Sequence, residues 1–599
     1  MRRLLAAALL AAPAGLAHAQ TSTGDVAVLL AERCASCHHP GGPAPFSLTT
    51  EADAQRHARQ IANVTRTRYM PPWKVDPDNG PFIGQKPLSD AELDLIERWA
   101  ASGATPVGGS GKESASRVSR AEGAWQLGRP DLIVTLDEPY TLAAEGTDVF
   151  RIFVLPIPAG GEKFVRGIEF LPGNARVVHH ANIRIDPTDA SRTLDAADPA
   201  PGYSGLIVRS AGYPDGHFLG WTPGQVAPLV PDDLSWRLSP HTDLVVELHM
   251  QPSGKPETVR PSIGFYFGDR APTRTPAMLR LGRQDLDIPA GDAGYTITDS
   301  YVLPVDVQVL ALQPHAHYRL REAHGEALLP DGSTRTLLTI RDWDFRWQHV
   351  YRYVTPLPLP KGTRLSMRYV YDNSPANPRN PEHPPLRAQW GQRSADEMGD
   401  LWFQVLTRTP ADLTTLETQF RRKAAAEDTK GYETEIKRNP TDIGLRNTIA
   451  MLYLELGQPM DAVRHFQVAV EAQPSSAAAH YNLGTALSLG RRLDEAMRQY
   501  QRALALDPAY ANAHNNLGNV LLAIGRTDEA IREFSEVVRL SPASPAALAN
   551  LAAAYAAARQ FDRALETADA ALKLKPPEPV ATALKEQRER YKQRAKAPR

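Results

Sequence analysis

Cys34, Cys37 and His38 stand in the spacing C-x-x-C-H, and the two cysteines are the only ones in the 599-residue chain. This spacing is the attachment sequence of a c-type haem, in which two thioethers fix the porphyrin and the adjacent imidazole binds the iron. A redox dithiol or a lone disulfide is the alternative, but a redox dithiol belongs in a thioredoxin-like βαβ setting, which is absent here. These residues therefore predict a covalent haem.

A sixth ligand to the haem iron is expected some tens of residues further along the chain. Met70, in the proline-stiffened stretch YMPPW, offers a thioether, and methionine–histidine ligation suits electron transfer. His39 and His57 are rival ligands, and simple packing is the other interpretation of Met70. We expect Met70 to be the ligand.

Three histidine features follow: His179-His180, His249 and His315-Ala316-His317. Residues i and i+2 of a strand face the same side, so His315 and His317 can close on one metal. Neighbours on a strand face opposite sides, so His179 and His180 can share a metal only at a bulge or a strand end. Ordinary surface or core histidines are the alternative. Imidazole clusters suit zinc, copper, iron or nickel.

The elements that position these histidines are expected to be strands. Residues 125–410 are rich in proline and show little helical periodicity, and short runs such as FRIFVLPI, LVVELHM and VQVLAL alternate with turn signals. This pattern predicts antiparallel sheets packed as β-sandwiches. The length suits two sandwiches, which we place at residues 129–272 and 273–410.

The N-terminal region predicts export. Residues 1–19 hold two arginines, a short apolar run and the small-x-small pattern Ala17-His18-Ala19, which is typical of a secretory signal peptide. We therefore expect a periplasmic or secreted protein. No later run of 18 apolar residues is found, so we expect no transmembrane anchor. The formal net charge of −1 gives no sign of nucleic-acid binding.

Residues 23–107 are expected to form a small helical domain around the haem. Helical patterns lie at 23–35 and from Asp90 to Trp99, where Ser89 and Glu92 form a capping-box pattern and Gly103 follows. The stretches CxxCHxPGGxAPFSL, MPPW and LSDAELDLIERWAASGA resemble the small cytochrome c domain attached to many bacterial periplasmic enzymes. Residues 108–128, rich in glycine and serine, predict a flexible linker.

The order HH…H…HxH…DEM, over roughly residues 130–408, resembles the copper type II, ascorbate-dependent monooxygenases, the family of peptidylglycine α-hydroxylating and dopamine β-monooxygenases. The resemblance implies jelly-roll-like domains and two copper ions. One copper transfers electrons and the other activates O2. The implied ligands of the first are His179, His180 and His249, with His241 as a rival third ligand, and those of the second, catalytic copper are His315, His317 and Met398.

The resemblance has departures that bear on the substrate. No cysteine is left for the disulfides of animal members, and the positions that grip a substrate carboxylate in peptide-hydroxylating members are Gln313, Asp400 and Trp402 here. An acidic Asp400 would repel a carboxylate, so we expect a neutral or cationic small molecule with an aromatic or apolar part. The alternative is that Asp400 is a solvated rim residue.

The last third of the chain has a repeat of 34 residues. This step links Pro440 to Pro576 through three further prolines, and it recurs at Ala462, Ala496, Ala530 and Ala564. The period predicts an all-α tetratricopeptide solenoid of four repeats over 441–576. We expect a helical connector at 411–440 and a charged capping helix and tail at 577–599. Such repeats usually bind a protein or peptide partner, and a structural spacer is the alternative.

Two hypotheses of function follow. The first is an exported copper monooxygenase that hydroxylates an activated C–H bond of a small molecule with O2, using electrons from an external reductant or redox protein. Fusion raises the effective concentration of the haem as a donor, so the haem is the expected source of electrons for the first copper. The second is a non-enzymatic relay or sensing scaffold that docks a partner through its repeats. Zinc at His315 and His317 is a further alternative.

Overall fold

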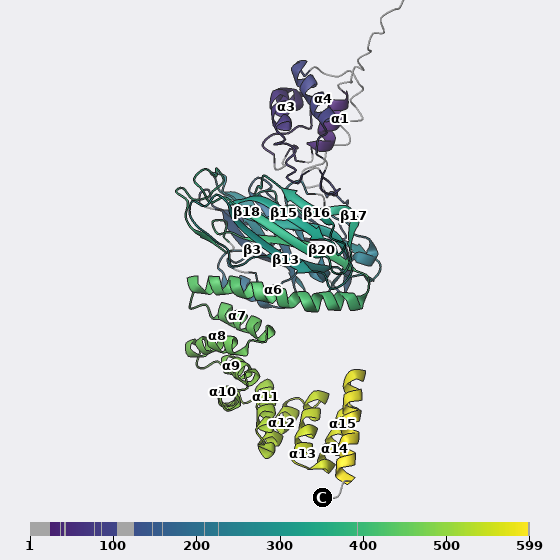
Figure 1. Ribbon diagram of the computed structural model, residues 1–599, viewed down its shortest axis with the longest axis vertical. Helices are drawn as coiled ribbons and strands as arrows, with labels where there is room; N and C mark the ends of the chain where they lie inside the picture. Colours follow the sequence, from purple (N-terminus) through teal and green to yellow (C-terminus); the bar gives the residue numbers. More distant parts are fainter. Residues whose placement is uncertain are drawn as a thin grey trace, which may run out of the picture. The chain divides into compact units, whose positions relative to one another are not determined.

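The computed structural model describes residues 24–596 except 36, 41–43, 77, 86, 105–124, 147, 159, 206, 209, 226 and 392. The chain divides into two compact units (Figure 1). The first holds an N-terminal helical segment and a β-rich region, and the second holds the C-terminal helices. The predicted signal peptide, residues 1–19, and most of the predicted linker lie outside the described residues.

The N-terminal segment contains four helices: α1 (Gly24–Arg33), α2 (Glu51–Arg56), α3 (Ala58–Arg66) and α4 (Asp90–Ala101). Val26, Ile61 and Trp99 share one apolar core. The predicted capping box is present, because the Ser89 hydroxyl accepts from the Glu92 N–H while the Glu92 carboxylate accepts from the Ser89 N–H. Local sequence signals thus predict this segment well.

The first sandwich, residues 132–268, has two four-stranded sheets. One has the order β1 (Leu132–Thr135), β10 (Ser262–Gly268), β4 (Lys163–Leu171) and β7 (Trp236–Leu238). The other has the order β3 (Val149–Pro156), β8 (Asp243–Met250), β5 (Val178–Asp186) and β6 (Gly220–Trp221). Smaller elements are β2 (Tyr140–Leu142) paired with β9 (Glu257–Val259), α5 (Ala190–Ala197), and the 3-10 turns η2 (Pro214–Gly216) and η3 (Asp232–Leu234).

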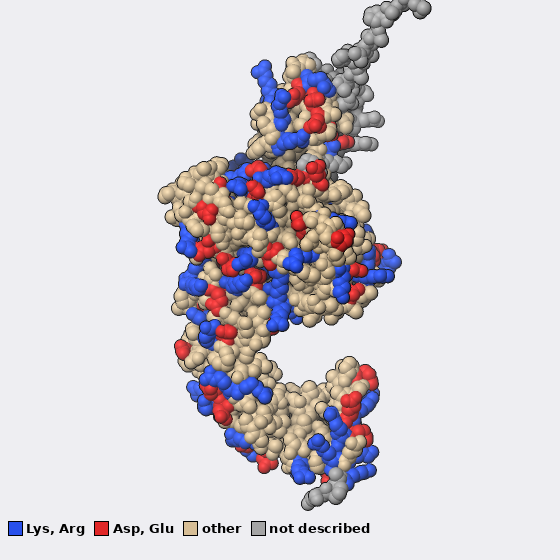
Figure 2. Space-filling view, viewed as in Figure 1, with Lys and Arg blue, Asp and Glu red and all other residues tan. Residues whose placement is uncertain are grey.

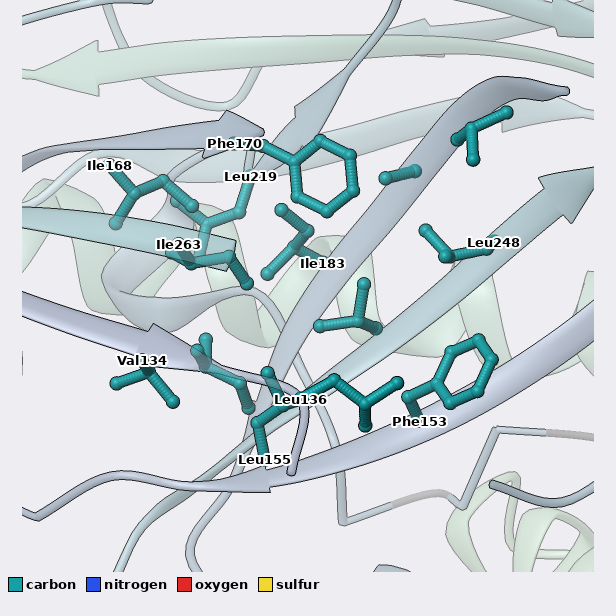
Figure 3. Packing of buried hydrophobic residues seen from close by; sticks show 14 of the residues in the cluster. Val134, Leu136, Phe153, Leu155, Ile168, Phe170, Ile183, Leu219, Leu248 and Ile263 are labelled. Atoms are coloured by element: carbon teal, nitrogen blue, oxygen red, sulfur yellow. The ribbon is translucent and has the colours of Figure 1, made fainter. Parts of the chain in front are cut away.

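The core of the first sandwich lies between its two sheets. Ile263 and Ile168 of one sheet pack in the same cluster as Phe153 and Leu248 of the other (Figure 3). Burying such a side chain contributes about 1.5–3 kcal/mol relative to exposing it. The core therefore holds β5 and β8, the strands that carry His180 and His249, in a fixed register.

The second sandwich, residues 277–407, repeats this plan. Its sheets have the orders β11 (Ala277–Gly282), β20 (Gly399–Thr407), β14 (Val307–Ala316), β17 (Tyr351–Leu359), and β13 (Tyr295–Val302), β18 (Arg364–Tyr371), β15 (Leu320–Leu328), β16 (Thr334–Ile340). A short pair joins β12 (Asp287–Ile288) and β19 (Ala388–Gln389). All strand pairs in the four-stranded sheets of both sandwiches are antiparallel. The prediction of a β-rich middle region is confirmed.

The C-terminal region is all-helical, as predicted. After α6 (Pro410–Arg438), four helix pairs follow: α7 (Ile443–Glu455) with α8 (Pro459–Ala472), α9 (Ala477–Leu489) with α10 (Leu493–Leu506), α11 (Ala511–Ala523) with α12 (Thr527–Leu540), and α13 (Pro545–Ala557) with α14 (Phe561–Lys573). The last helix is α15 (Glu578–Lys596). The four alanines that recur every 34 residues are all fully buried, because each lies where two helices approach closely.

Basic and acidic side chains are interspersed on the face drawn in Figure 2. Among the described residues, no helix combines the length and apolar character needed to cross a bilayer.

Candidate functional site

His180 and His249 face each other across the pair β5–β8. They are Cα partners in the ladder, and their ring centroids lie 4.9 Å apart. The register shifts between Val178 and His180, so His179 sits in a bulge, and its ring lies 5.2 Å from that of His249. A bulge is the condition under which the sequence allowed His179 and His180 to serve one metal, and the structure has it.

The environment of this first group suits neutral imidazoles. His249 is 1% exposed, and neither of its ring nitrogens has a hydrogen-bond partner among the described residues, although Asp148 Oδ2 lies 3.2 Å from Nε2. Burial lowers the pKa of His179 to about 4 and that of His180 well below its ordinary value. A neutral imidazole with a free nitrogen is the form that binds a metal, so these residues fit a copper.

The second group lies at the end of β14. The rings of His315 and His317 are 5.6 Å apart. Burial, followed by the nearby His315, lowers the pKa of His317 to about 3. Nδ1 of His317 donates to the carbonyl of Asp396 at 3.1 Å. This bond leaves Nε2 as the nitrogen with a free lone pair, the usual arrangement of an imidazole metal ligand.

Met398 lies next to this second group along the neighbouring strand. Ala316 pairs with Gly399 in the ladder between β14 and β20, so the next residues outward are His317 and Met398. The fully buried Glu397 accepts from the backbone N–H groups of His317, Arg319 and Met398. The Glu397 carboxylate therefore holds the backbone of two predicted copper ligands together, a role that the sequence did not indicate.

Phe345 lies between the two groups. Its ring centroid is 5.2 Å from that of His249, 6.0 Å from His180 and 5.5 Å from His317. A second link joins the sandwiches, because the Tyr318 hydroxyl donates to Asp148 Oδ2 at 2.9 Å. Sequence reasoning missed Phe345, Tyr318 and Asp148, and the only signal near Phe345 was the aromatic run DWDFRW.

A small cavity of about 20 Å³ borders both groups, and its wall includes His180, His315 and Gln313. The other two residues of the predicted substrate pocket do not line it. Asp400 lies 3.8 Å from the Arg280 guanidinium, and the Trp402 ring packs 6.2 Å from Tyr213. Of the three predicted pocket residues, only Gln313 is thus placed beside the histidines.

The rival ligand His241 lies away from the first group. It is exposed, has a φ of 60°, and precedes β8, whereas His249 lies near the other end of that strand. Among the described residues there is no group of three or more His, Cys, Asp or Glu side chains arranged to hold a metal. Two of the three proposed ligands at the second site are imidazoles, and the third is a thioether.

The haem-attachment residues also have a suitable environment. Nδ1 of His38 donates to the carbonyl of Phe46 at 3.0 Å, which leaves Nε2 as the free ligand nitrogen. Cys34 and Cys37 form no disulfide, and Met70 is half-buried. The rivals have other contacts: His39 bonds the Pro40 carbonyl, and the ring of His57 stacks on Phe46. These observations fit a haem on Cys34, Cys37 and His38.

Comparison with known proteins bears on the C-terminal region. No curated protein matches the chain. Crystal structures of MamA (27% identity, 26% of this chain and 91% of that chain, TM-score 0.25) and of YrrB, a TPR protein with an unusual peptide-binding site (23% identity, 27% and 84%, TM-score 0.25), are among the similar structures. Family models for the TPR repeat and the tetratricopeptide repeat match residues 492–525 and 515–579. The chain therefore carries tetratricopeptide repeats over residues 492–579.

Proposed function

We propose that the chain is an exported copper-dependent monooxygenase that hydroxylates an activated C–H bond of a small organic substrate with O2. The observation that carries this proposal is the convergence of the two histidine groups, one from each sandwich, on Phe345. Two groups of ligands that share one buried region suit a reaction that needs electrons from two metal centres.

Each group would hold one copper ion. His179, His180 and His249 would bind the first, and His315, His317 and Met398 the second, where the soft thioether favours Cu(I). Bound copper would supply O2 activation and one-electron chemistry. The protein contributes neutral imidazoles, a Glu397 carboxylate that orients two ligands, and a buried setting that limits access of water.

The haem held by Cys34, Cys37 and His38, with Met70 as the sixth ligand, would supply electrons by one-electron redox chemistry. Covalent haem attachment takes place outside the cytoplasm, which agrees with the proposed periplasmic or secreted location. The repeats would bind a protein or peptide partner, since the inner face of stacked helix pairs offers an extended surface.

The decisive experiment combines metal and haem analysis with an oxygen-18 product screen on the purified mature chain. The proposal expects two copper ions and one haem per chain, and product oxygen that comes from O2. The matched variant His317→Ala should abolish hydroxylation while the haem content stays unchanged. Product without label from O2, or full activity in His317→Ala, would contradict the proposal.

A second candidate is a relay or sensing scaffold without catalysis. It is favoured by the lack, among the described residues, of a three-residue His, Cys, Asp or Glu metal group. Such a scaffold would consume O2 only to peroxide, or not at all, when ascorbate or a reduced cytochrome is supplied. The product screen therefore separates the two candidates.

A further inference from the structure

A cavity of about 400 Å³ lies in the first unit, apart from the small cavity beside His315. Its wall has three sources. Trp73, Gly84 and Gln85 come from the N-terminal segment, Gly224 comes from the first sandwich, and His349 and Arg352 come from the second.

The N-terminal segment is held against the second sandwich by residues 73–76 and 78–85, here called the docking segment. The Asp76 N–H donates to the Thr339 carbonyl at 2.9 Å, and the Ile83 N–H donates to the Arg352 carbonyl at 2.8 Å. Phe82 is 6% exposed, and its ring lies 4.9 Å from that of Tyr353. Backbone pairing and a buried aromatic anchor thus fix one wall of the cavity.

The cavity begins next to a haem-attachment residue. Gly224 has a φ of +78°, and a Cβ built on it would lie 2.7 Å from Cys37 Sγ. Gly224 also lines the cavity. The sulfur that would carry the porphyrin therefore borders the loop of the first sandwich that forms this wall.

The far wall holds a cation with no anion beside it. No carboxylate of the described residues lies within ion-pair distance of Arg352; its Nη1 donates to Gln404 Oε1 at 3.2 Å, and its buried Nε has no partner. Burial lowers the pKa of the Arg352 guanidinium to about 10. His349, 4% exposed, bonds Thr222 through Nδ1, whereas its Nε2 has no partner among the described residues. A buried charge without a counter-charge is costly, so this wall suits an anionic group.

We propose that this cavity receives the edge of the haem attached at Cys34 and Cys37, and that Arg352 and His349 complete the haem environment by meeting its carboxylates. A haem has an apolar macrocycle and two carboxylates, which matches an apolar cavity that begins at Cys37 and ends at a cation. The second sandwich then supplies part of the haem pocket, and the donor domain is docked rather than loosely tethered. This inference rests on the proposed haem attachment.

The test is a redox titration of the haem in the copper-free, full-length chain without O2. A nearby cation favours the reduced haem, so Arg352→Gln should lower the midpoint potential, and the ratio of reduced to oxidised haem at a fixed potential should fall by about fivefold. Arg352→Lys should retain most of the wild-type potential. Arg364→Gln, which removes an exposed arginine of β18, is the matched control and should not change it.

A second pair of variants tests the position of Cys37 without changing a charge. Gly224→Ala should alter the haem absorption spectrum, because its methyl group would collide with Cys37. Gly254→Ala bears the same left-handed strain, at a φ of +88°, but meets nothing within 4 Å, so its spectrum should match the wild type. An unchanged potential in Arg352→Gln, an unchanged spectrum in Gly224→Ala, or a chain without covalent haem would each overturn the proposal. The monooxygenase proposal can fail without affecting these measurements, because they need neither copper nor O2.

Discussion

The ring of Phe345 lies 5.2 Å from the imidazole of His249, although the two residues belong to different sandwiches. Phe345 is 2% exposed and also packs against His317 and Tyr318. One side chain thus contacts both histidine groups and the residue that bonds Asp148. Packing across the two sandwiches, more than any single strand, sets the spacing between the groups.

Replacing Phe345 should therefore be costly. Phe345→Ala is expected to lower the free energy of unfolding of the metal-free chain by about 3–5 kcal/mol, because it leaves a cavity among buried rings. Copper content should fall as well, since both groups lose a shared packing surface. Leu328→Ala, at a side chain that is 39% exposed, is the control and should change stability little. Equal denaturation curves for Phe345→Ala and the wild type would refute this role.

The assignment of the first copper group can be tested within one strand and its preceding turn. His249→Ala should remove one copper ion per chain, because His249 is the imidazole closest to both His179 and His180 in the paired strands. His241→Ala is a matched control, as His241 is exposed at the start of β8. Metal analysis after copper loading measures both variants. Loss of copper in His241→Ala, with copper kept in His249→Ala, would exchange the two assignments.

Features that depend on neighbours in the sequence were predictable. The capping box of α4 needs only Ser89 and Glu92, and the helix pairs of the C-terminal region follow from a period of 34 residues. The alternating strands also predicted the β-rich region. The bulge at His179 was recognised as a requirement, but its presence depends on the register of β5 against β8.

Contacts between distant segments were not predictable. Tyr318 and Asp148 are 170 positions apart, and the docking segment pairs with strands more than 250 positions further along the chain. No periodicity links such residues, because each contact arises from how whole sheets and segments pack. Asp400 illustrates the opposite error: the resemblance suggested a substrate contact, whereas its carboxylate lies beside Arg280.

The C-terminal region should be sensitive to acid through Glu433. Its carboxylate accepts from His465 Nε2 at 3.0 Å and from the Tyr453 hydroxyl at 2.8 Å, and the bond from His465 is the main cause that holds the pKa of Glu433 below its ordinary value. A depressed folded pKa stabilises the fold above the unfolded value near 4.5, and this stability is lost as pH falls through it. Glu433→Gln should weaken the pH dependence of the urea midpoint between pH 6 and about 3. Glu586→Gln, an exposed control on α15, should keep the wild-type dependence.

The repeats should depend on a glycine in each close helix contact. A Cβ at Gly518 would lie 2.8 Å from the Phe534 ring. Gly518→Ala is expected to lower the free energy of unfolding by about 1–3 kcal/mol through overpacking, despite the better helix propensity of alanine. Gly444→Ala, where the closest atom is a carboxylate oxygen of Asp442 at 3.3 Å, is the control and should be neutral or slightly stabilising. Thermal unfolding followed by circular dichroism distinguishes them, and equal melting curves would contradict the packing argument.

Glu397 offers the sharpest test of how the second copper group is positioned. Its buried carboxylate accepts from the backbone N–H groups of His317, Arg319 and Met398. Glu397→Ala would leave these donors without a partner, at about 1–3 kcal/mol each, and it frees Met398 to move away from His317. We expect selective loss of the copper assigned to His315, His317 and Met398, while the first copper remains.

Copper content and the spectrum of the remaining ion measure this outcome. Glu326→Ala removes an exposed carboxylate from β15 and should bind both ions. Glu397→Gln keeps one acceptor oxygen, so its copper content should lie between the wild type and Glu397→Ala. If Glu397→Ala folds and binds both ions as the wild type does, the carboxylate does not position these ligands. Loss of both ions together would instead mean that Glu397 supports the whole second sandwich rather than one metal group.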